Sequence, residues 1–150
     1  MSLAPTDPPV TLTDVDETNW RTACALNVHR DQIDFVAPVS YYLALCAYGQ
    51  DWQPLAIMVG DAIVGFVMWA VDDSDASFWI GGLLVDAAYQ RRGYGRASVE
   101  QLIEMAALRG YSEVALSYQP TNPARNLYEE LGFAETGEME DDEVVARRRL

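Results

Sequence analysis

The chain has 150 residues, of which 50% are hydrophobic and 22% are charged. This composition predicts an ordinary soluble globular protein, and the length suits one domain over residues 1–150. Acidic side chains outnumber basic ones by 23 to 10, which gives a net charge of −13. Such a charge disfavours binding to nucleic acid or to an anionic membrane and favours a cationic small molecule, although it also serves solubility.

The chain shows no apolar run of membrane-spanning length, and it does not open with a basic and then apolar leader. We therefore expect a cytoplasmic protein. Its two cysteines, Cys24 and Cys46, lack the spacing of a metal or redox motif. Both lie in apolar helical patterns, so we expect buried free thiols and no bound metal.

Hydrophobic periodicity and turn residues predict alternating strands and helices. We expect a strand at 10–12, helices at 17–28 and 39–48, strands at 55–59, 62–70 and 77–85, a helix ending before Gly110, a strand at 113–118, a helix ending at 131–133, and two final strands, the second at 144–150. The order is β-α-α-β-β-β-α-β-α-β-β, which predicts a mixed sheet with helices on both faces.

Two local signals refine these elements. Asn122 followed by Pro123 is typical of a helix start, with Asn as the N-cap and Pro as the first helical residue. Gly81 and Gly82 lie inside a predicted strand, where glycine indicates a β-bulge or the close approach of a ligand.

The segment around Gly93 and Gly95 joins a buried strand to an amphipathic helix. The first N–H groups of a helix lack carbonyl partners within it, and the helix dipole is positive there, so this turn is a candidate anion site. Arg91, Arg92 and Arg96 add cationic donors, whereas residues 31–90 contain eight aspartates and no Lys, Arg or His. A merely solvated turn is the alternative.

Two common phosphate motifs do not fit this turn. The chain has no G-x-x-x-x-G-K-[ST] sequence, which excludes a P-loop. A dinucleotide-binding turn would need a third glycine where Ser98 stands, and an acidic residue at the end of the next strand, whereas Glu113 begins that strand.

The Gln90–Gly95 segment instead resembles the acyl-CoA pyrophosphate loop of the GNAT superfamily of N-acetyltransferases, whose pattern is Q/R-x-x-G-x-G/A. A second motif of that family is matched by Asn122 and by residues 127–133, LYEELGF. The resemblance covers essentially the whole chain and implies the GNAT fold, an α/β (α+β) class. In that fold two parallel strands, here 77–85 and 113–118, splay apart around acyl-CoA.

The resemblance also implies site residues. Acetyl-CoA would be held by the backbone of Leu83, Leu84 and Val85 and by Gln90, Arg91, Arg92, Gly93, Tyr94, Gly95, Arg96 and Asn122. Tyr128 would be the general acid that protonates the CoA thiolate, although a core tyrosine is the structural alternative. Asn122 is compatible with capping, binding or both. The general base stays open between Asp86, Asp31, Asp34 and a chain of water molecules.

Three shorter stretches, at 17–20, 31–37 and 79–82, resemble the bacterial spermine/spermidine (diamine) acetyltransferase branch. This implies a polyamine acceptor, with Asp31 and Asp34 as candidate contacts for its ammonium groups. Relatives are often dimers, so a homodimer is expected. The alternatives are an acetyltransferase for another amine, such as an aminoglycoside-like compound or an amino-acid derivative, and a non-catalytic acyl-CoA-binding module.

Overall fold

The computed structural model describes residues 9–49 and 51–150. The elements are β1 (Val10–Asp14), α1 (Trp20–Cys24), η1 (Arg30–Gln32), α2 (Val39–Tyr48), β2 (Gln53–Val59), β3 (Ala62–Asp72), β4 (Ser77–Val85), η2 (Ala87–Tyr89), α3 (Tyr94–Leu108), β5 (Glu113–Tyr118), α4 (Arg125–Glu130), β6 (Ala134–Glu140) and β7 (Glu143–Arg149). Apart from the two short 3₁₀ helices, η1 and η2, the predicted order of strands and helices is confirmed. None of the helices in the described residues is long and apolar enough to span a membrane.

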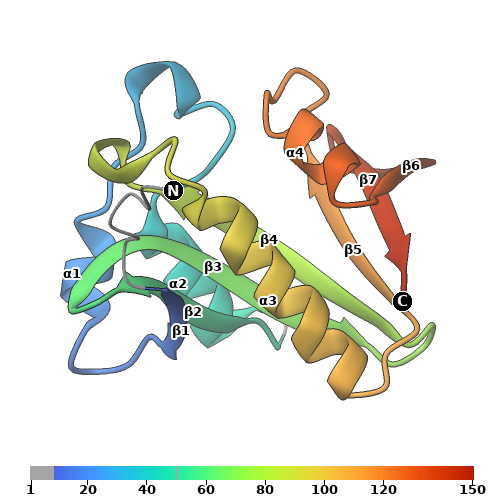
Figure 1. The fold of residues 1–150 in the computed structure, drawn as a ribbon, viewed down its shortest axis with the longest axis horizontal. Coiled ribbons are helices and arrows are strands. Elements are labelled where there is room, and N and C mark those ends of the chain that lie inside the picture. Colours follow the sequence, from blue (N-terminus) through green and yellow to red (C-terminus); the bar gives the residue numbers. More distant parts are fainter. Residues whose placement is uncertain (1–8, 50) are drawn as a thin grey trace, which may run out of the picture.

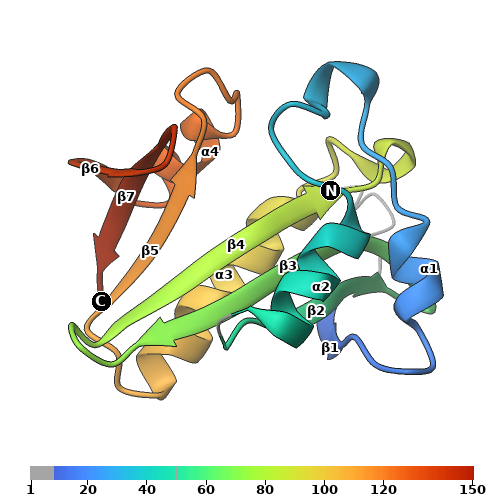
Figure 2. The same ribbon diagram turned by 180° about the vertical axis from the view of Figure 1, so that it is seen from behind.

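The seven strands form one sheet in the order β1-β2-β3-β4-β5-β7-β6. Neighbouring strands are antiparallel except for β4 and β5, so the predicted mixed sheet is confirmed. Helix α3 covers one face, whereas α1 and α2 cover the other (Figures 1 and 2). Each face therefore has its own core: Phe78, Val99 and Leu102 belong to the first, and Val39 and Phe66 to the second.

The parallel pair separates soon after it begins. Only Ser77–Trp79 of β4 pairs with Glu113–Ala115 of β5. Beyond that point, β5 stays paired with β7 on its other side, and the unit made by β5, β6, β7 and α4 diverges from β4 (Figure 1). The residues of β4 from Ile80 onward consequently face a gap, as the splayed strands of the predicted fold require.

A β-bulge in β4 lies at the start of this unpaired stretch. Phe66 pairs with Leu84 and Met68 pairs with Gly81, so two residues of β4 oppose one residue of β3. Gly82, one of the two, has φ +61°, a conformation that glycine adopts without strain. The bulge that the Gly81–Gly82 pair predicts is therefore present, and it changes the direction in which the following peptide groups point.

The first predicted helix is wrong in length. A helix was expected over 17–28, whereas α1 spans only Trp20–Cys24. Its continuation is prevented by long-range bonds, because the Asn27 N–H donates to the Asp86 carboxylate at 2.9 Å and the Ala87 N–H donates to the Asn27 carbonyl at 2.8 Å. These bonds draw residues 25–29 out of the helical path and toward the end of β4.

Two smaller predictions also need correction. Helix α4 begins at Arg125, and Asn122 caps the preceding turn instead, since its Oδ1 accepts the Ala124 N–H at 2.9 Å. Cys24 and Cys46 are free thiols as predicted, but both are half-buried and not fully buried.

We predict that Gly82→Ala destabilises the protein more than Gly137→Ala does. Both glycines have positive φ, and an L-residue there costs about 1–2 kcal/mol. At Gly137 a β-carbon meets nothing within 4 Å, whereas at Gly82 it lies 3.3 Å from the rings of Phe66 and Tyr42. The free energy of unfolding from urea denaturation measures the difference, and equal losses would mean that the bulge tolerates a side chain.

Candidate active site

Two cavities meet in the gap between β4 and the unit that contains α4. We call the first the arginine cavity, because Arg91 and Arg96 line it, and it encloses about 390 Å³. The second, the acidic cavity, encloses about 720 Å³ and is lined by carboxylates. Leu83, Asn122 and Tyr128 line both cavities, as do Phe35 and Val36. The residues shared by the two cavities mark where a ligand in one would reach a ligand in the other.

The arginine cavity brings together nearly all residues that were predicted to bind acetyl-CoA. Its lining includes Leu83, Leu84, Val85, Gln90, Arg91, Gly93, Tyr94, Gly95, Arg96 and Asn122. Arg92 is the exception: its guanidinium lies over the Tyr89 ring, 5.8 Å from the ring centroid.

The start of α3 fits a phosphate group. Gly93 precedes the helix in the left-handed conformation, with φ +81°, and a β-carbon there would meet nothing within 4 Å. A β-carbon on Gly95 would face only Val85 Cγ2, at 3.9 Å, so the backbone of this turn is open toward the cavity. The positive end of a 15-residue helix dipole and the two arginines favour an anion in that space.

The side chain of Gln90 is occupied within the protein. Its Nε2 donates to the Val85 carbonyl at 2.8 Å and to Gln32 Oε1 at 2.7 Å, while Gln32 Nε2 donates to Gln90 Oε1 at 2.9 Å. Gln32 lies in η1, in the loop between α1 and α2, which runs beside the loop before α3 (Figures 1 and 2). The Gln32–Gln90 amide pair therefore connects the loop between α1 and α2, which lines both cavities, to the segment 90–95 before α3. Only the backbone of Gln90 remains available to a ligand.

Two other charged residues near the arginine cavity have structural partners. Arg96 forms an ion pair with Glu130 at the end of α4, which links the two helices across the cavity. Asp86, one candidate for the general base, caps η2 through the Ala88 N–H at 3.1 Å and also binds the Asn27 N–H. It lines neither cavity, so its role in this structure is to hold the loop.

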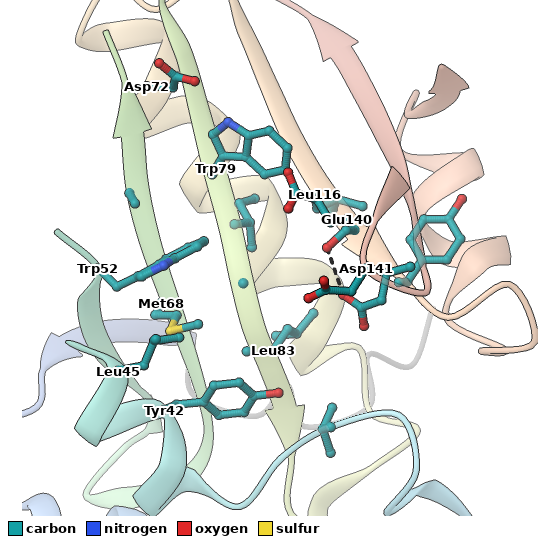
Figure 3. A pocket seen from close by; sticks show the side chains of 18 of the residues that line it. Tyr42, Leu45, Trp52, Met68, Asp72, Trp79, Leu83, Leu116, Glu140 and Asp141 are labelled. Carbon is teal, nitrogen blue, oxygen red and sulfur yellow. Dashed lines mark hydrogen bonds between the residues drawn. The ribbon is translucent and has the colours of Figure 1, made fainter. Parts of the chain in front are cut away.

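The acidic cavity combines an aromatic wall with a set of carboxylates. Tyr42 and Trp52 lie on one side of β4, and Glu140 and Asp141 lie on the other (Figure 3). Seven carboxylates line it, from Asp51, Asp72, Asp73, Glu140, Asp141, Asp142 and Glu143, and its lining among the described residues includes no cationic side chain. Carboxylates and aromatic faces both attract ammonium groups.

Asp31 and Asp34, which were predicted to contact the acceptor, line neither cavity, although their neighbours Gln32 and Phe35 do. The carboxylates of the acidic cavity come instead from the segment before β2, from the end of β3 and the turn after it, from the end of β6, and from the turn before β7 and the first residue of that strand. The sequence is acidic at 140–143, but nothing in it shows that this stretch faces the gap, because its position depends on the pairing of β7 with β5.

Tyr128 projects from α4 to the junction of the two cavities. Its side chain is buried, and its ring packs against Tyr118 and Phe133 with centroid distances of 5.4 and 6.2 Å. The Tyr118 hydroxyl donates to Glu135 and the Tyr42 hydroxyl accepts the Ala37 N–H, whereas the Tyr128 hydroxyl has no hydrogen-bond partner among the described residues. It is therefore available to a ligand.

Burial is the main reason that the pKa of the Tyr128 hydroxyl is raised above 10.0, with smaller contributions from Tyr118, Glu143 and Tyr42. Burial and the hydrogen bond to Glu135 likewise raise the pKa of Tyr118 to about 12. A raised pKa keeps the phenol protonated at neutral pH, so Tyr128 can act as a donor in the junction.

Comparison with known proteins places this arrangement among acetyltransferases. The chain is 24% identical over 134 residues to the spermine/spermidine N(1)-acetyltransferase of Bacillus subtilis, which covers 84% of this chain and 88% of that protein. It is 31% identical over 119 residues to N-acetylaspartate synthetase of Danio rerio, covering 79% of this chain and 39% of that protein.

Among solved structures, the fold matches spermidine N-acetyltransferase from Vibrio cholerae in complex with CoA and spermine, with a TM-score of 0.72, 17% identity and 94% coverage of both chains. The sequence model of the acetyltransferase (GNAT) family matches residues 18–133. The predicted family is thereby confirmed, and the chain belongs to the GNAT family of N-acetyltransferases.

Proposed function

We propose that the protein transfers the acetyl group of acetyl-CoA to a primary amine of a small cationic acceptor, a polyamine such as spermidine or spermine. One observation carries the proposal: Tyr128 lines both a cavity that contains two arginines and a cavity that contains seven carboxylates. The donor is an anion and the acceptor a cation, so the two cavities suit opposite ends of the same reaction.

The arginine cavity would hold acetyl-CoA. The backbone at the start of α3, with Arg91 and Arg96, would bind the pyrophosphate, and the peptide groups of Leu83–Val85 beyond the bulge would bind the pantetheine arm and the thioester. Asn122 lines both cavities and already caps the turn before α4, so any contact with the cofactor would come from the remaining capacity of its amide.

The acidic cavity would hold the acceptor. A polyamine carries several ammonium groups, and the carboxylates would attract those that are not being acetylated while the aromatic wall covers the hydrocarbon segments. The same charge disfavours an anionic acceptor, which separates this proposal from an activity like that named for the Danio rerio relative. It also fits other cationic amines, so the acceptor has to be tested directly.

A panel of amines tests the proposal. Release of free CoA thiol from acetyl-CoA is followed with spermidine, spermine, an aminoglycoside, aspartate and an alanine-terminated peptide as acceptors. We expect polyamines to give the highest kcat/KM. A preference for aspartate or a neutral amine would refute the polyamine assignment, and acetyl-CoA binding without turnover on any amine would support a non-catalytic module.

The carboxylates of the acidic cavity predict a specific change in this assay. Asp72→Asn should raise the KM for spermidine about two- to fivefold, because an exposed charge contributes about 0.2–1 kcal/mol, and added salt should reduce the difference. Asp34→Asn removes the same charge outside both cavities and should change this KM less. Equal increases of the KM in the two variants would contradict an acceptor site in the acidic cavity and would favour the 31–37 loop.

Gly95→Val tests the phosphate loop. Valine is a better helix former than glycine, and its β-carbon would approach only Val85, so the fold should survive. The branched side chain would nevertheless occupy the space over the helix start, and we expect the Kd for CoA to rise at least about tenfold in calorimetric titration. Leu108→Val, at the exposed far end of α3, is the control. A folded Gly95→Val protein with normal affinity would contradict the assignment.

Tyr128→Phe tests the proton donor. The ring packing is kept, and loss of a general acid costs about 10²- to 10⁴-fold in rate; we expect the lower end, because a thiol with a pKa of about 8.5 leaves readily. The loss should fall on kcat and not on the KM for acetyl-CoA. A variant with normal kcat, and with chemistry rate-limiting, would make Tyr128 a core residue.

The raised pKa of Tyr128 gives a second prediction. Because burial raises the pKa of Tyr128, the unaltered enzyme should lose no activity through ionisation of this phenol between pH 7 and 10.

A further inference from the structure

Glu143 differs from the other carboxylates of the acidic cavity. Six of the seven are exposed, and Glu143, the first residue of β7, is half-buried. Its Oε1 accepts the Ser117 hydroxyl at 2.9 Å across the β5–β7 pair. The neighbouring pairs, Ser117 with Val145 and Tyr118 with Val144, fix the backbone on both sides of this contact. This hydrogen bond orients the Glu143 carboxylate, whereas the side chains of Glu140, Asp141 and Asp142 in the adjoining turn are exposed to solvent.

The Glu143 carboxylate also affects two tyrosine hydroxyls of the acidic cavity. It lines the same cavity as Tyr42 of α2 and Tyr128 of α4. Burial is the largest cause of the raised pKa of both phenols, and the negative charge of Glu143 adds to the shift in each case. Glu143 therefore shares a cavity with both phenols, and the hydrogen bond from Ser117 orients its carboxylate there.

We propose that Glu143 is the catalytic base, which accepts the proton that the acceptor nitrogen loses, directly or through one water molecule. This inference rests on the proposed acetyltransfer, and it identifies the general base, which the sequence does not determine. The acceptor attacks as the neutral amine, after its ammonium form has lost one proton to solvent. Its lone pair forms the bond to the thioester carbon as the carbonyl electrons move onto oxygen, and the positively charged nitrogen then gives its second proton to Glu143. The oxyanion then re-forms the carbonyl as the C–S bond breaks and the Tyr128 hydroxyl protonates the sulfur, and the proton on Glu143 returns to the Tyr128 phenolate through solvent.

The strength of a carboxylate suits this step. A free alkylammonium has a pKa near that of lysine, about 10.4, and a carboxylate does not deprotonate it efficiently. The first proton therefore goes to solvent, and the small neutral fraction of the amine reacts. Once this neutral nitrogen has added to the thioester it is positively charged and far more acidic, and a carboxylate can then remove its proton. Glu143 would thus prevent the adduct from expelling the amine again, and its effect belongs in kcat.

Two isosteric variants separate a base from a mere attraction. Glu143→Gln keeps the amide oxygen for the Ser117 hydroxyl but cannot take a proton, so kcat with spermidine should fall at least about 10²-fold, with little change in the KM for acetyl-CoA. Glu140→Gln removes an equal charge from the same cavity and should mainly raise the KM for spermidine. Similar kcat values in the two variants would overturn the inference.

Chemical rescue adds a readout that a structural role would not move. In Glu143→Ala, added formate should restore part of kcat in proportion to its concentration, while Glu140→Ala should not respond. Calorimetric titration with CoA checks that each variant retains its fold. Normal kcat in Glu143→Gln, or no formate response in a folded Glu143→Ala, would overturn this inference alone. Absence of amine acetylation by the unaltered protein would overturn the proposed function as well.

Discussion

The separation of β4 from β5 is the constraint on which the rest of this structure depends. Two parallel strands normally remain paired, because unpaired backbone groups away from water are costly. Here β5 keeps its partner β7 on one side, and the Gly82 bulge redirects the backbone of β4 on the other. The peptide groups of β4 beyond Trp79 are left facing the gap, where an extended ligand can act as the missing strand.

A cluster around Arg147 holds the two halves together at the point where they part. Its guanidinium pairs with Glu113 of β5 at 2.7 Å, with Glu138 of β6 at 2.9 Å and with Asp75 in the β3–β4 turn at 3.2 Å. It also lies over the Trp79 ring, 5.2 Å from the centroid. One arginine on β7 thus binds groups from both sides of the gap, and the divergence starts from a fixed point.

The sequence specified the scaffold better than the site. Elements with a strong period and clear turn residues, such as α2, β4 and β5, have the predicted bounds, because their burial pattern and their ends are local properties. The helix at 17–28 was overestimated because Asn27 bonds to residues 59 and 60 positions away. The Gln32–Gln90 pair spans 58 positions, and no local pattern marks either glutamine as its partner.

The acceptor side could not be predicted for the same reason. From sequence alone, an acidic turn such as 140–143 is indistinguishable from any solvent-exposed turn. Whether it faces the gap depends on which strand β7 pairs with. Most residues of the motif that resembles the cofactor loop do line one cavity, because they are neighbours in the sequence: the glycines, the helix start and the arginines lie within seven residues. Asp31 and Asp34 looked equally suitable by charge alone, yet only the fold decides which carboxylates share a cavity with Tyr128.

The burial of Tyr128 shows how the two cavities depend on each other. The ring of Tyr128 is packed by Tyr118 and Phe133, whereas its hydroxyl binds none of the described residues and is open to the cavities that Tyr128 lines. Phenylalanine would keep the same ring packing, so the packing alone does not require the hydroxyl. In the proposed reaction the hydroxyl acts when both cavities are filled, because a donor at their junction then meets the atoms that change charge. The same low-polarity surroundings that raise its pKa also strengthen any hydrogen bond it gives to a developing anion.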